Sequence, residues 1–190
     1  RRAAEKGIAQ AEYNLAECYA FGLGVPRDYV EAVKWYRAAS EGGDAKAQHR
    51  LSVCYAVGHG VAQDYKQAVH WCRQAADKGH AEAQKNLGVA YANGQGATQD
   101  HVEAVKWYRM AAGQGFAAAQ FNLGLCYARA QGVEQDLVEA AKWYQLAATQ
   151  CYAAAQCELG LCCSSGRGLP QDKGEAFKWW LKAAQQDFLP

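Results

Sequence analysis

The sequence predicts an all-α superhelix, or solenoid, built from five helix-turn-helix units of 36 residues each. Three observations support this fold class: the chain matches itself at a constant spacing, the matched positions carry helical periodicity, and a glycine-rich turn divides every unit into two helices. The units begin at Ala9, Ala45, Ala81, Ala117 and Ala153 without insertion or deletion. The predicted repeats are therefore residues 9–44, 45–80, 81–116, 117–152 and 153–188, which together form a single solenoid domain.

Several positions hold the same residue in all five repeats. In the first repeat these positions are Ala9, Ala11, Leu15, Asp28, Ala32, Trp35 and Ala39. Tyr19 recurs in the next three repeats, and Cys163 takes its place in the fifth. Because random drift does not align so many large residues, the repeat is a property of the architecture.

The first helix of each repeat carries an apolar stripe. Ala11, Leu15 and Tyr19 lie four residues apart and therefore fall on one side of a helix. We expect this stripe to be buried.

A turn rich in glycine follows the first helix. In the first repeat it covers residues 21–27 and contains Gly22 and Gly24, whose backbones adopt conformations that other residues resist. Ala130 stands at the first glycine position in the fourth repeat. We therefore expect that this position does not require a positive φ.

An aspartate begins the second helix of every repeat. Asp28 is followed three residues later by Glu31, and Glu or Gln has the same place in the other repeats, which is the spacing of a capping box. We expect the carboxylate to accept hydrogen bonds from the free amides of the first turn. Ala32, Trp35 and Ala39 then follow at helical spacing, and the tryptophan is expected to fill the space between repeats.

Glycine ends the second helix in three repeats, at Gly43, Gly79 and Gly115. Cys151 and Asp187 stand at this position in the last two repeats, so we expect those exits to be built differently.

One hairpin cannot bury the apolar stripes of both its helices, whereas stacked hairpins can. The repeats should therefore form a continuous right-handed superhelix with a concave and a convex side. Residues 1–8 match the end of a second helix, so we expect the chain to open within a preceding repeat, as a fragment or a processed product.

Composition excludes several classes of partner. The 20 Lys and Arg residues against 19 Asp and Glu give a net charge of +1, which argues against nucleic acid and anionic membranes. No apolar run reaches the roughly 18 residues of a membrane span, and the first residues lack the apolar stretch of a signal peptide. Cytoplasm, periplasm and secretion all stay open as compartments.

The repeated string resembles the Sel1-like repeat, a longer-turned relative of the tetratricopeptide repeat. The third repeat matches that pattern at Ala83, Gln84, Leu87, Gly88, Tyr91, Gly94, Gly96, Asp100, Ala104, Trp107, Tyr108, Ala111 and Ala112. The resemblance covers almost the whole chain. It implies an α-solenoid adaptor that holds peptides or other proteins, and it does not identify the partner.

Four of the eight cysteines share one repeat position on the apolar stripe: Cys18, Cys54, Cys126 and Cys162. Equivalent positions in neighbouring repeats should lie roughly 9–10 Å apart. A disulfide needs Cα atoms within about 7 Å, so these four cannot cross-link to one another. We expect reduced core thiols.

A cysteine-rich branch of the resembled family is stapled by a regular pair of cysteines in each repeat, and this chain lacks that regular pairing. The remaining possible partners are Cys54 with Cys72, and the group Cys151, Cys157, Cys162 and Cys163. The sequence has no CxxC pair, so we expect no zinc site.

No pattern in the sequence predicts catalysis or a cofactor. His49, His59, His70, His80 and His101 form no pair at ligand spacing and are expected on the surface. The Gly-x-Gly turns follow helices rather than strands and are not phosphate loops. No HExxH motif and no nucleophile elbow are present.

The variable face of the first helices is the candidate binding site. By analogy with tetratricopeptide repeats, the face opposite the Leu and Tyr stripe lines a concave groove. The candidate partner-binding residues are Tyr13, Asn14, Glu17, His49, Arg50, Val53, Lys85, Asn86, Val89, Phe121, Asn122 and Leu125. Phe121 and Leu125 are unusual choices for a solvated face, and exposed apolar patches usually mark contact sites.

The sequence thus predicts a non-catalytic adaptor for a protein or peptide, with no cofactor, no metal and no nucleic-acid partner. One alternative is a structural unit that assembles through uncapped ends, where Trp179, Trp180, Phe188 and Leu189 gather. A second alternative is a cysteine-rich protein that handles redox chemistry or a cofactor.

Overall fold

A computed structural model describes residues 8–186, which form ten helices and no strands. The prediction of an all-α fold is confirmed. The helices gather into two compact units, one up to Gln99 and one from Asp100 onward. The handedness and curvature expected for the whole array stay predictions.

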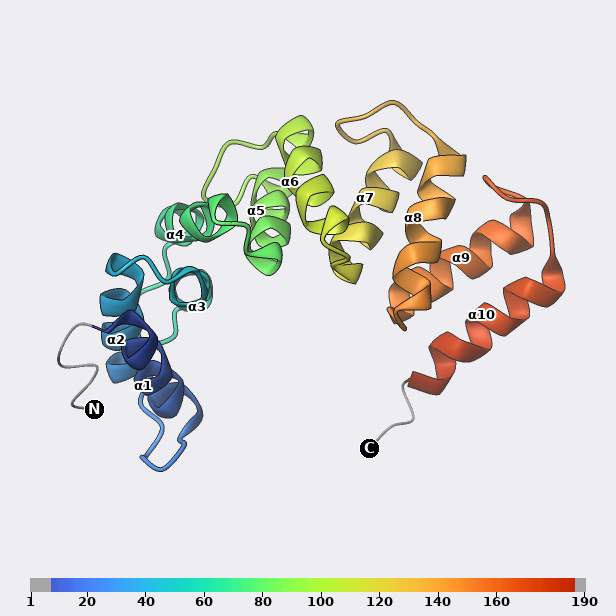
Figure 1. Ribbon diagram of the computed structural model, residues 1–190. Coiled ribbons are helices and arrows are strands. Elements are labelled where there is room, and N and C mark those ends of the chain that lie inside the picture. The colour runs from blue at the N-terminus through green and yellow to red at the C-terminus, as the bar shows by residue number, and fades with distance from the viewer. Residues whose placement is uncertain (1–7, 187–190) are drawn as a thin grey trace. The chain divides into compact units, whose positions relative to one another are not determined.

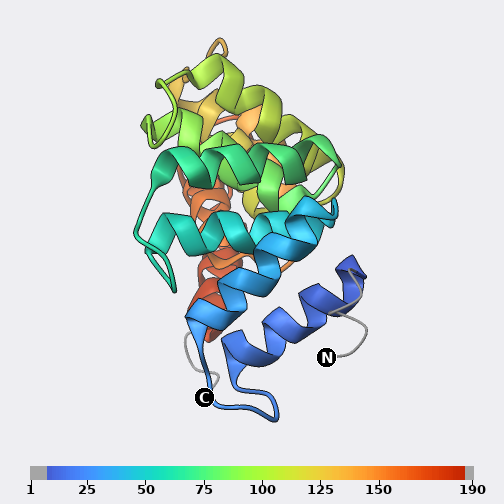
Figure 2. The same ribbon diagram turned by 90° about the vertical axis from the view of Figure 1, so that its left-hand side faces the viewer.

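The first unit holds five helices: α1 (Ala9–Phe21), α2 (Tyr29–Glu41), α3 (Ala45–Val57), α4 (Tyr65–Asp77) and α5 (Ala81–Asn93). Each helix packs against the next one in the chain (Figure 1). Figure 2 shows α1 to α4 lying side by side in chain order. The core of this unit forms where alanines of adjacent helices meet the invariant Leu51 and the buried Tyr36.

The second unit holds α6 (His101–Gly113), α7 (Ala117–Arg129), α8 (Leu137–Thr149), α9 (Ala153–Ser165) and α10 (Lys173–Gln186). Here too each helix packs against its successor. Leu123 and Leu159 are buried, as the stripe on the first helices predicts, and Trp107 is only 7% exposed. Alanines at the contact positions allow the helices to approach closely.

The aspartate caps of the second helices are confirmed. Asp28 Oδ1 accepts hydrogen bonds from the amides of Val30 at 2.9 Å and Glu31 at 3.1 Å, and the equivalent aspartates cap in the same way. The other half of the capping box is built differently. The Asp28 amide donates to the carbonyl oxygen of Tyr19 at 2.9 Å, while Glu31 pairs with Lys34. The cap therefore also ties the second helix to the first.

Both expectations about non-glycine residues in the turns were wrong. Ala130 ends α7 with a φ of 55°, in the left-handed conformation that Gly22 adopts at the same position. Cys151 has a φ of 61° and keeps the left-handed exit that Gly43 makes, so this exit is not built differently. The geometry of the hairpin imposes these backbone angles whatever residue is present. Asp187 lies outside the described residues.

Buried glutamines connect successive hairpins. Gln48 donates from Nε2 to the carbonyl oxygen of Ser40 at 3.1 Å, and Gln84, Gln120 and Gln156 donate in the same way to carbonyls eight residues earlier. Each acceptor belongs to the last turn of the preceding second helix, where carbonyls have no amide four residues further along the helix. Each of these carbonyls also accepts the backbone amide three residues later, so the glutamine adds a second, buried hydrogen bond to it.

From the second repeat onward, the second glycine of the turn allows the turn to pack on the preceding hairpin. A Cβ atom placed on Gly60 would lie 2.1 Å from the carbonyl oxygen of Tyr29, and one on Gly96 would lie 2.0 Å from that of Tyr65. Gly132 and Gly168 make the same approach in the second unit. Only glycine permits so close a contact, so this position fixes the spacing between adjacent hairpins.

Candidate functional site

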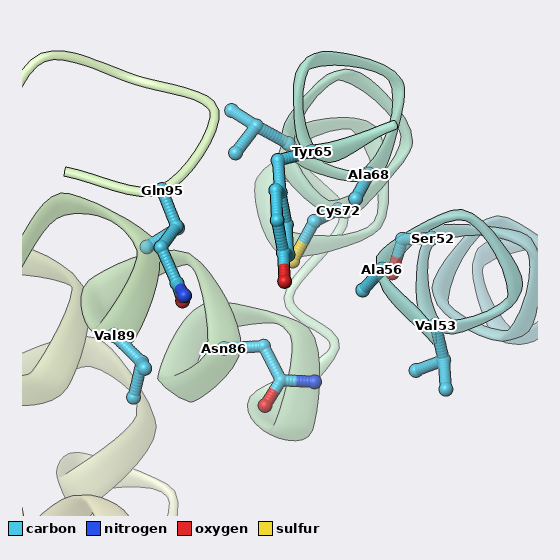
Figure 3. A pocket seen from close by; sticks show the side chains of 11 residues that line it. Ser52, Val53, Ala56, Tyr65, Ala68, Cys72, Asn86, Val89 and Gln95 are labelled. Atoms are coloured by element: carbon cyan, nitrogen blue, oxygen red, sulfur yellow. The ribbon is translucent and has the colours of Figure 1, made fainter. Parts of the chain in front are cut away.

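A recess in the first unit is lined by three of the candidate binding residues. Its volume is about 210 Å³, and it lies where α3, α4 and α5 meet. Val53 lines it from α3, and Asn86 and Val89 line it from α5 (Figure 3). Tyr65 and Cys72 of α4 also line it, and neither is among the candidate binding residues.

A recess in the second unit occupies the equivalent place, where α7, α8 and α9 meet. Its volume is about 450 Å³. Leu125, Leu137, Tyr144, Glu158 and Leu161 line it at positions 72 residues after Val53, Tyr65, Cys72, Asn86 and Val89. The same position of the fold therefore carries a recess in both units.

The two recesses differ in their chemistry. The walls of the first recess are apolar side chains with the amides of Asn86 and Gln95, and no charged residue lines it. The second recess includes the charged side chains of Arg129, Glu158 and Arg167. A shared position on the fold thus presents two different surfaces.

Tyr13, Glu17 and Arg50 form a network within the first unit rather than a free surface. The Arg50 guanidinium pairs with Glu17 at 3.2 Å, and the buried Tyr36 donates a hydrogen bond to the same carboxylate. The rings of Tyr13 and Tyr36 lie 6.1 Å apart. These residues are partly buried and hold α1, α2 and α3 together. Asn14, by contrast, is exposed and accepts a hydrogen bond from Gln10.

His49 is buried, so the expectation that it lies on an open face was wrong. Its imidazole stacks on that of His80, with ring centroids 4.7 Å apart, and its Nε2 lies 3.0 Å from the Asn86 amide. Burial lowers the pKa of His49 to about 4, against the opposing effect of Glu82. The imidazole is therefore neutral at physiological pH and serves as a polar part of the interface between α3 and α5.

Phe121 is partly buried and packs against the core of the second unit. Its ring lies 5.9 Å from that of Tyr144 and 5.3 Å from that of Tyr152. The rings of Tyr144 on α8 and of Tyr152 before α9 cover part of Phe121, so this candidate residue is partly buried rather than fully open. Asn122 and Leu125, on the same helix, are partly exposed.

All eight cysteines carry free thiols in the structure. Burial raises the pKa of Cys54 to about 11 and that of Cys126 to about 11, and it also raises the pKa of Cys162. The thiolate is the reactive form, so these buried thiols are poor nucleophiles at neutral pH. Cys151 and Cys157 are exposed.

Residues 8–186 contain no group of three or more His, Cys, Asp or Glu side chains placed to hold a metal ion. In the same range, no helix has both the length and the apolar character needed to cross a membrane.

One signal in the sequence could have revealed Cys72 as a site residue. The residue after the invariant tryptophan is aromatic in four repeats, namely Tyr36, Tyr108, Tyr144 and Trp180. Cys72 is the exception, and the recess of the first unit lies beside it. Position 72 can be identified from the sequence because it departs from the aromatic residue that the other repeats have there.

Comparison with known proteins identifies the repeat. The Sel1 repeat profile matches residues 9–44, 45–80, 81–116, 117–150 and 153–188. No curated protein sequence matches the chain.

Two solved structures resemble the chain over nearly its full length. A protective antigen of uropathogenic Escherichia coli with an SLR fold is 40% identical over 98% of this chain, with a TM-score of 0.94. A Sel1 repeat protein from Oxalobacter formigenes is 33% identical over 95% of this chain, with a TM-score of 0.89. The chain spans 40% of the length of the first protein and 74% of the second. The chain therefore belongs to the Sel1 repeat family, and its fold is an all-α solenoid.

Proposed function

We propose that the chain is a non-catalytic scaffold that binds protein or peptide partners at its two recesses, one in each unit. Sel1 repeat proteins are generally scaffolds for protein interactions. The observation that carries the proposal is the recurrence of one recess at equivalent repeat positions in both units. A site that the architecture repeats can be varied at its lining without disturbing the fold.

The contrast between constant and variable repeat positions supports this proposal. The residues that are constant across the repeats, such as Leu51, Ala75 and Asp64, form the core or cap the helices. The residues that line the recesses vary: Val53 corresponds to Leu125, and Asn86 corresponds to Glu158. Variable apolar side chains that remain partly exposed are typical of contact surfaces.

The chemistry of the linings indicates what each recess would bind. The first recess has apolar walls with two carboxamides, which can both donate and accept hydrogen bonds. The second adds two guanidinium groups and one carboxylate, which suit a polar or charged side chain. Each recess would therefore select a different kind of side chain.

A peptide display selection tests the proposal. Peptides selected on the wild-type chain should bind Val89→Glu much more weakly, because this change places a charge in an apolar recess. Val30→Glu is the matched control, since Val30 is 66% exposed on α2 and lies outside the recess. Equal binding to the wild type and to Val89→Glu, or a selection that yields no binding peptide, would contradict the proposal.

A second candidate function is self-association through α10. Phe177, Trp180 and Leu181 are exposed apolar side chains on this helix. Light scattering over a range of concentrations should show an increase in mass for the wild type that Phe177→Ser reduces. A constant monomer mass at all concentrations removes this candidate. Phe188 and Leu189, which were predicted to gather with Trp179 and Trp180 at an uncapped end, lie outside the described residues.

A further inference from the structure

The recess of the first unit lies where the repeat pattern loses an aromatic ring. In the first, third and fourth repeats the residue after the invariant tryptophan is a buried tyrosine, namely Tyr36, Tyr108 and Tyr144. The second repeat has Cys72 at this position. A cysteine side chain has two heavy atoms and a tyrosine side chain eight, so the exchange removes most of the volume that fills this place.

The fourth repeat shows where the missing ring would lie. The Tyr144 ring packs against the backbone of α7 at Gly124, so closely that a Cβ atom on Gly124 would lie 2.6 Å from the ring. In the second repeat the corresponding pair is Ser52 and Cys72, and both line the recess (Figure 3). The recess of the first unit therefore reaches the place that a tyrosine ring occupies in the fourth repeat.

The polar atoms at the base of the recess already have partners. The Cys72 thiol donates to the carbonyl oxygen of Ala83 at 3.1 Å, and the Ser52 hydroxyl donates to that of His49 at 2.7 Å. An apolar group can therefore enter the base of the recess without breaking these hydrogen bonds. A polar group at the base would find both donors already in use.

The rim of the recess suits the edge of an aromatic ring. Figure 3 shows the Asn86 and Gln95 side chains on one side, with Tyr65 beside them and Ser52 on the opposite side. The Tyr65 ring offers an edge or a face to an incoming ring, which is the arrangement that aromatic pairs prefer. The two carboxamides can bond a phenol hydroxyl or an indole N–H.

A positive charge lies beside the recess. Lys85 donates from Nζ to Asn86 Oδ1 at 2.6 Å, and Asn86 lines the recess. Among the residues that the structure describes, Lys85 makes no salt bridge with a carboxylate. An acidic residue on the ligand would supply a carboxylate to pair with the ammonium group of Lys85.

From these observations we propose that the recess of the first unit binds one aromatic side chain of a partner polypeptide, next to an acidic residue of the same segment. This inference rests on the proposed scaffold function and specifies the partner at one of its two recesses. The second recess, although larger, is not expected to bind in this way, because Tyr144 occupies the equivalent place and charged side chains line it.

The test uses a variant that fills the base of the recess with the residue pair found in the fourth repeat. Ser52→Gly combined with Cys72→Tyr reproduces the Gly124 and Tyr144 pair of the fourth repeat, and should fold because that pair already packs in this chain. Cys72→Ser is the matched control, because it removes the thiol and leaves the recess open. Circular dichroism checks that both variants keep their helices.

The probes are short synthetic peptides of glycine and serine with one central residue, Trp, Tyr, Leu or Ala, flanked by either Asp or Lys. Binding is followed through the NMR signals of the Val53 and Val89 methyl groups. Peptides with an aromatic centre and Asp flanks should bind the wild type and Cys72→Ser at least about tenfold more tightly than the alanine peptide. The closed double variant should lose this difference, and Lys85→Glu should reverse the preference for Asp over Lys flanks.

Three results would overturn the inference: no methyl shifts with any aromatic peptide, equal binding of the aromatic and alanine peptides, or unchanged binding to the closed double variant. Failure of this inference differs from failure of the scaffold proposal. Display-selected peptides that depend on Val89 but contain no required aromatic residue would leave the scaffold function intact and exclude the aromatic site.

Discussion

Arg109 donates a hydrogen bond from Nη2 to the hydroxyl oxygen of Tyr127 at 2.8 Å, with its guanidinium carbon 5.9 Å from the ring centroid. The pair joins the second helix of one repeat to the first helix of the next. It recurs as Arg37 with Tyr55 and as Arg73 with Tyr91. At the following junction both members are replaced together, by Gln145 and Cys163, and a recess of about 340 Å³ lies beside them.

This pair should stabilise the junction between adjacent repeats. Tyr127→Phe should lower the free energy of unfolding by about 1 kcal/mol, because the guanidinium loses its acceptor while the ring remains. A double-mutant cycle with Arg109→Ala, followed by urea denaturation, measures the coupling. Strictly additive effects would show that the contact contributes nothing to stability.

Gly60 should tolerate alanine far less well than Gly24. Both residues have a positive φ, of 72° and 74°, so the backbone cost of a side chain is the same at the two positions. They differ in surroundings, since a Cβ on Gly60 meets the Tyr29 carbonyl whereas one on Gly24 meets nothing within 4 Å. Gly60→Ala should therefore lower the thermal midpoint more than Gly24→Ala does. Equal decreases in the thermal midpoint of the two variants would mean that backbone strain at a positive φ alone explains the effect.

Ala130→Gly should stabilise the chain. A left-handed conformation costs an alanine about 1–2 kcal/mol, and glycine avoids this cost while losing about 0.4–1 kcal/mol through its more flexible unfolded state. The expected gain is about 0.5–1 kcal/mol in chemical denaturation. Ala128→Gly in the last turn of the same helix is the control and should destabilise the chain by about 1 kcal/mol. A loss of stability with Ala130→Gly would contradict the strain argument.

Stability should fall between pH 6.5 and about 4 because of His49. Burial lowers the pKa of this imidazole from 6.5 to about 4, so the unfolded chain binds more protons than the folded chain in that interval. The free energy of unfolding therefore rises with pH across this window and is fully regained above it. The groups facing His49 are His80 and Glu82, together with the cations Arg50 and Lys85.

His49→Gln should flatten this pH dependence, whereas His70→Gln, at an exposed imidazole on α4, should leave it unchanged. Thermal midpoints measured at intervals of pH between 4 and 7 distinguish the two variants. A slope that survives in His49→Gln would assign it to other groups, with His80 the first to examine, since burial also lowers its pKa.

The fold could be predicted from the sequence because each local signal has a single structural solution. The stripe of Leu51 and its equivalents is buried, and Asp28 and its equivalents begin the second helices. A repeat multiplies such evidence, since each position is observed five times. The same repetition made Gln48 and its equivalents visible as a column, but their role depends on a carbonyl that only the packed structure brings near.

The candidate site was only partly predictable. Val53, Asn86, Val89 and Leu125 do line the recesses. His49 does not lie on an open surface, because the face opposite the stripe is itself covered where the next hairpin packs on it. A sequence pattern divides a helix into one apolar face and one polar face. In this fold, however, the first helix of a repeat contacts neighbouring helices on more than one side, so part of its polar face is also buried.

The backbone angles of Ala130 and Cys151 were not predictable from residue type. Propensity favours glycine at a positive φ, yet tertiary contacts impose the angle on both residues. A departure from the glycine column is therefore evidence of strain that the fold tolerates and not of a different turn.

The buried glutamine bridges have a consequence for how such arrays can change length. Gln84 and Gln156 each bond a backbone carbonyl, which every residue possesses, rather than a particular side chain of the preceding repeat. A 36-residue segment inserted or removed in register would bring the same donor to the same kind of acceptor. Sel1 arrays of different lengths can therefore be assembled by duplication or by protein engineering, because each new junction can form the same hydrogen bond from glutamine to a backbone carbonyl.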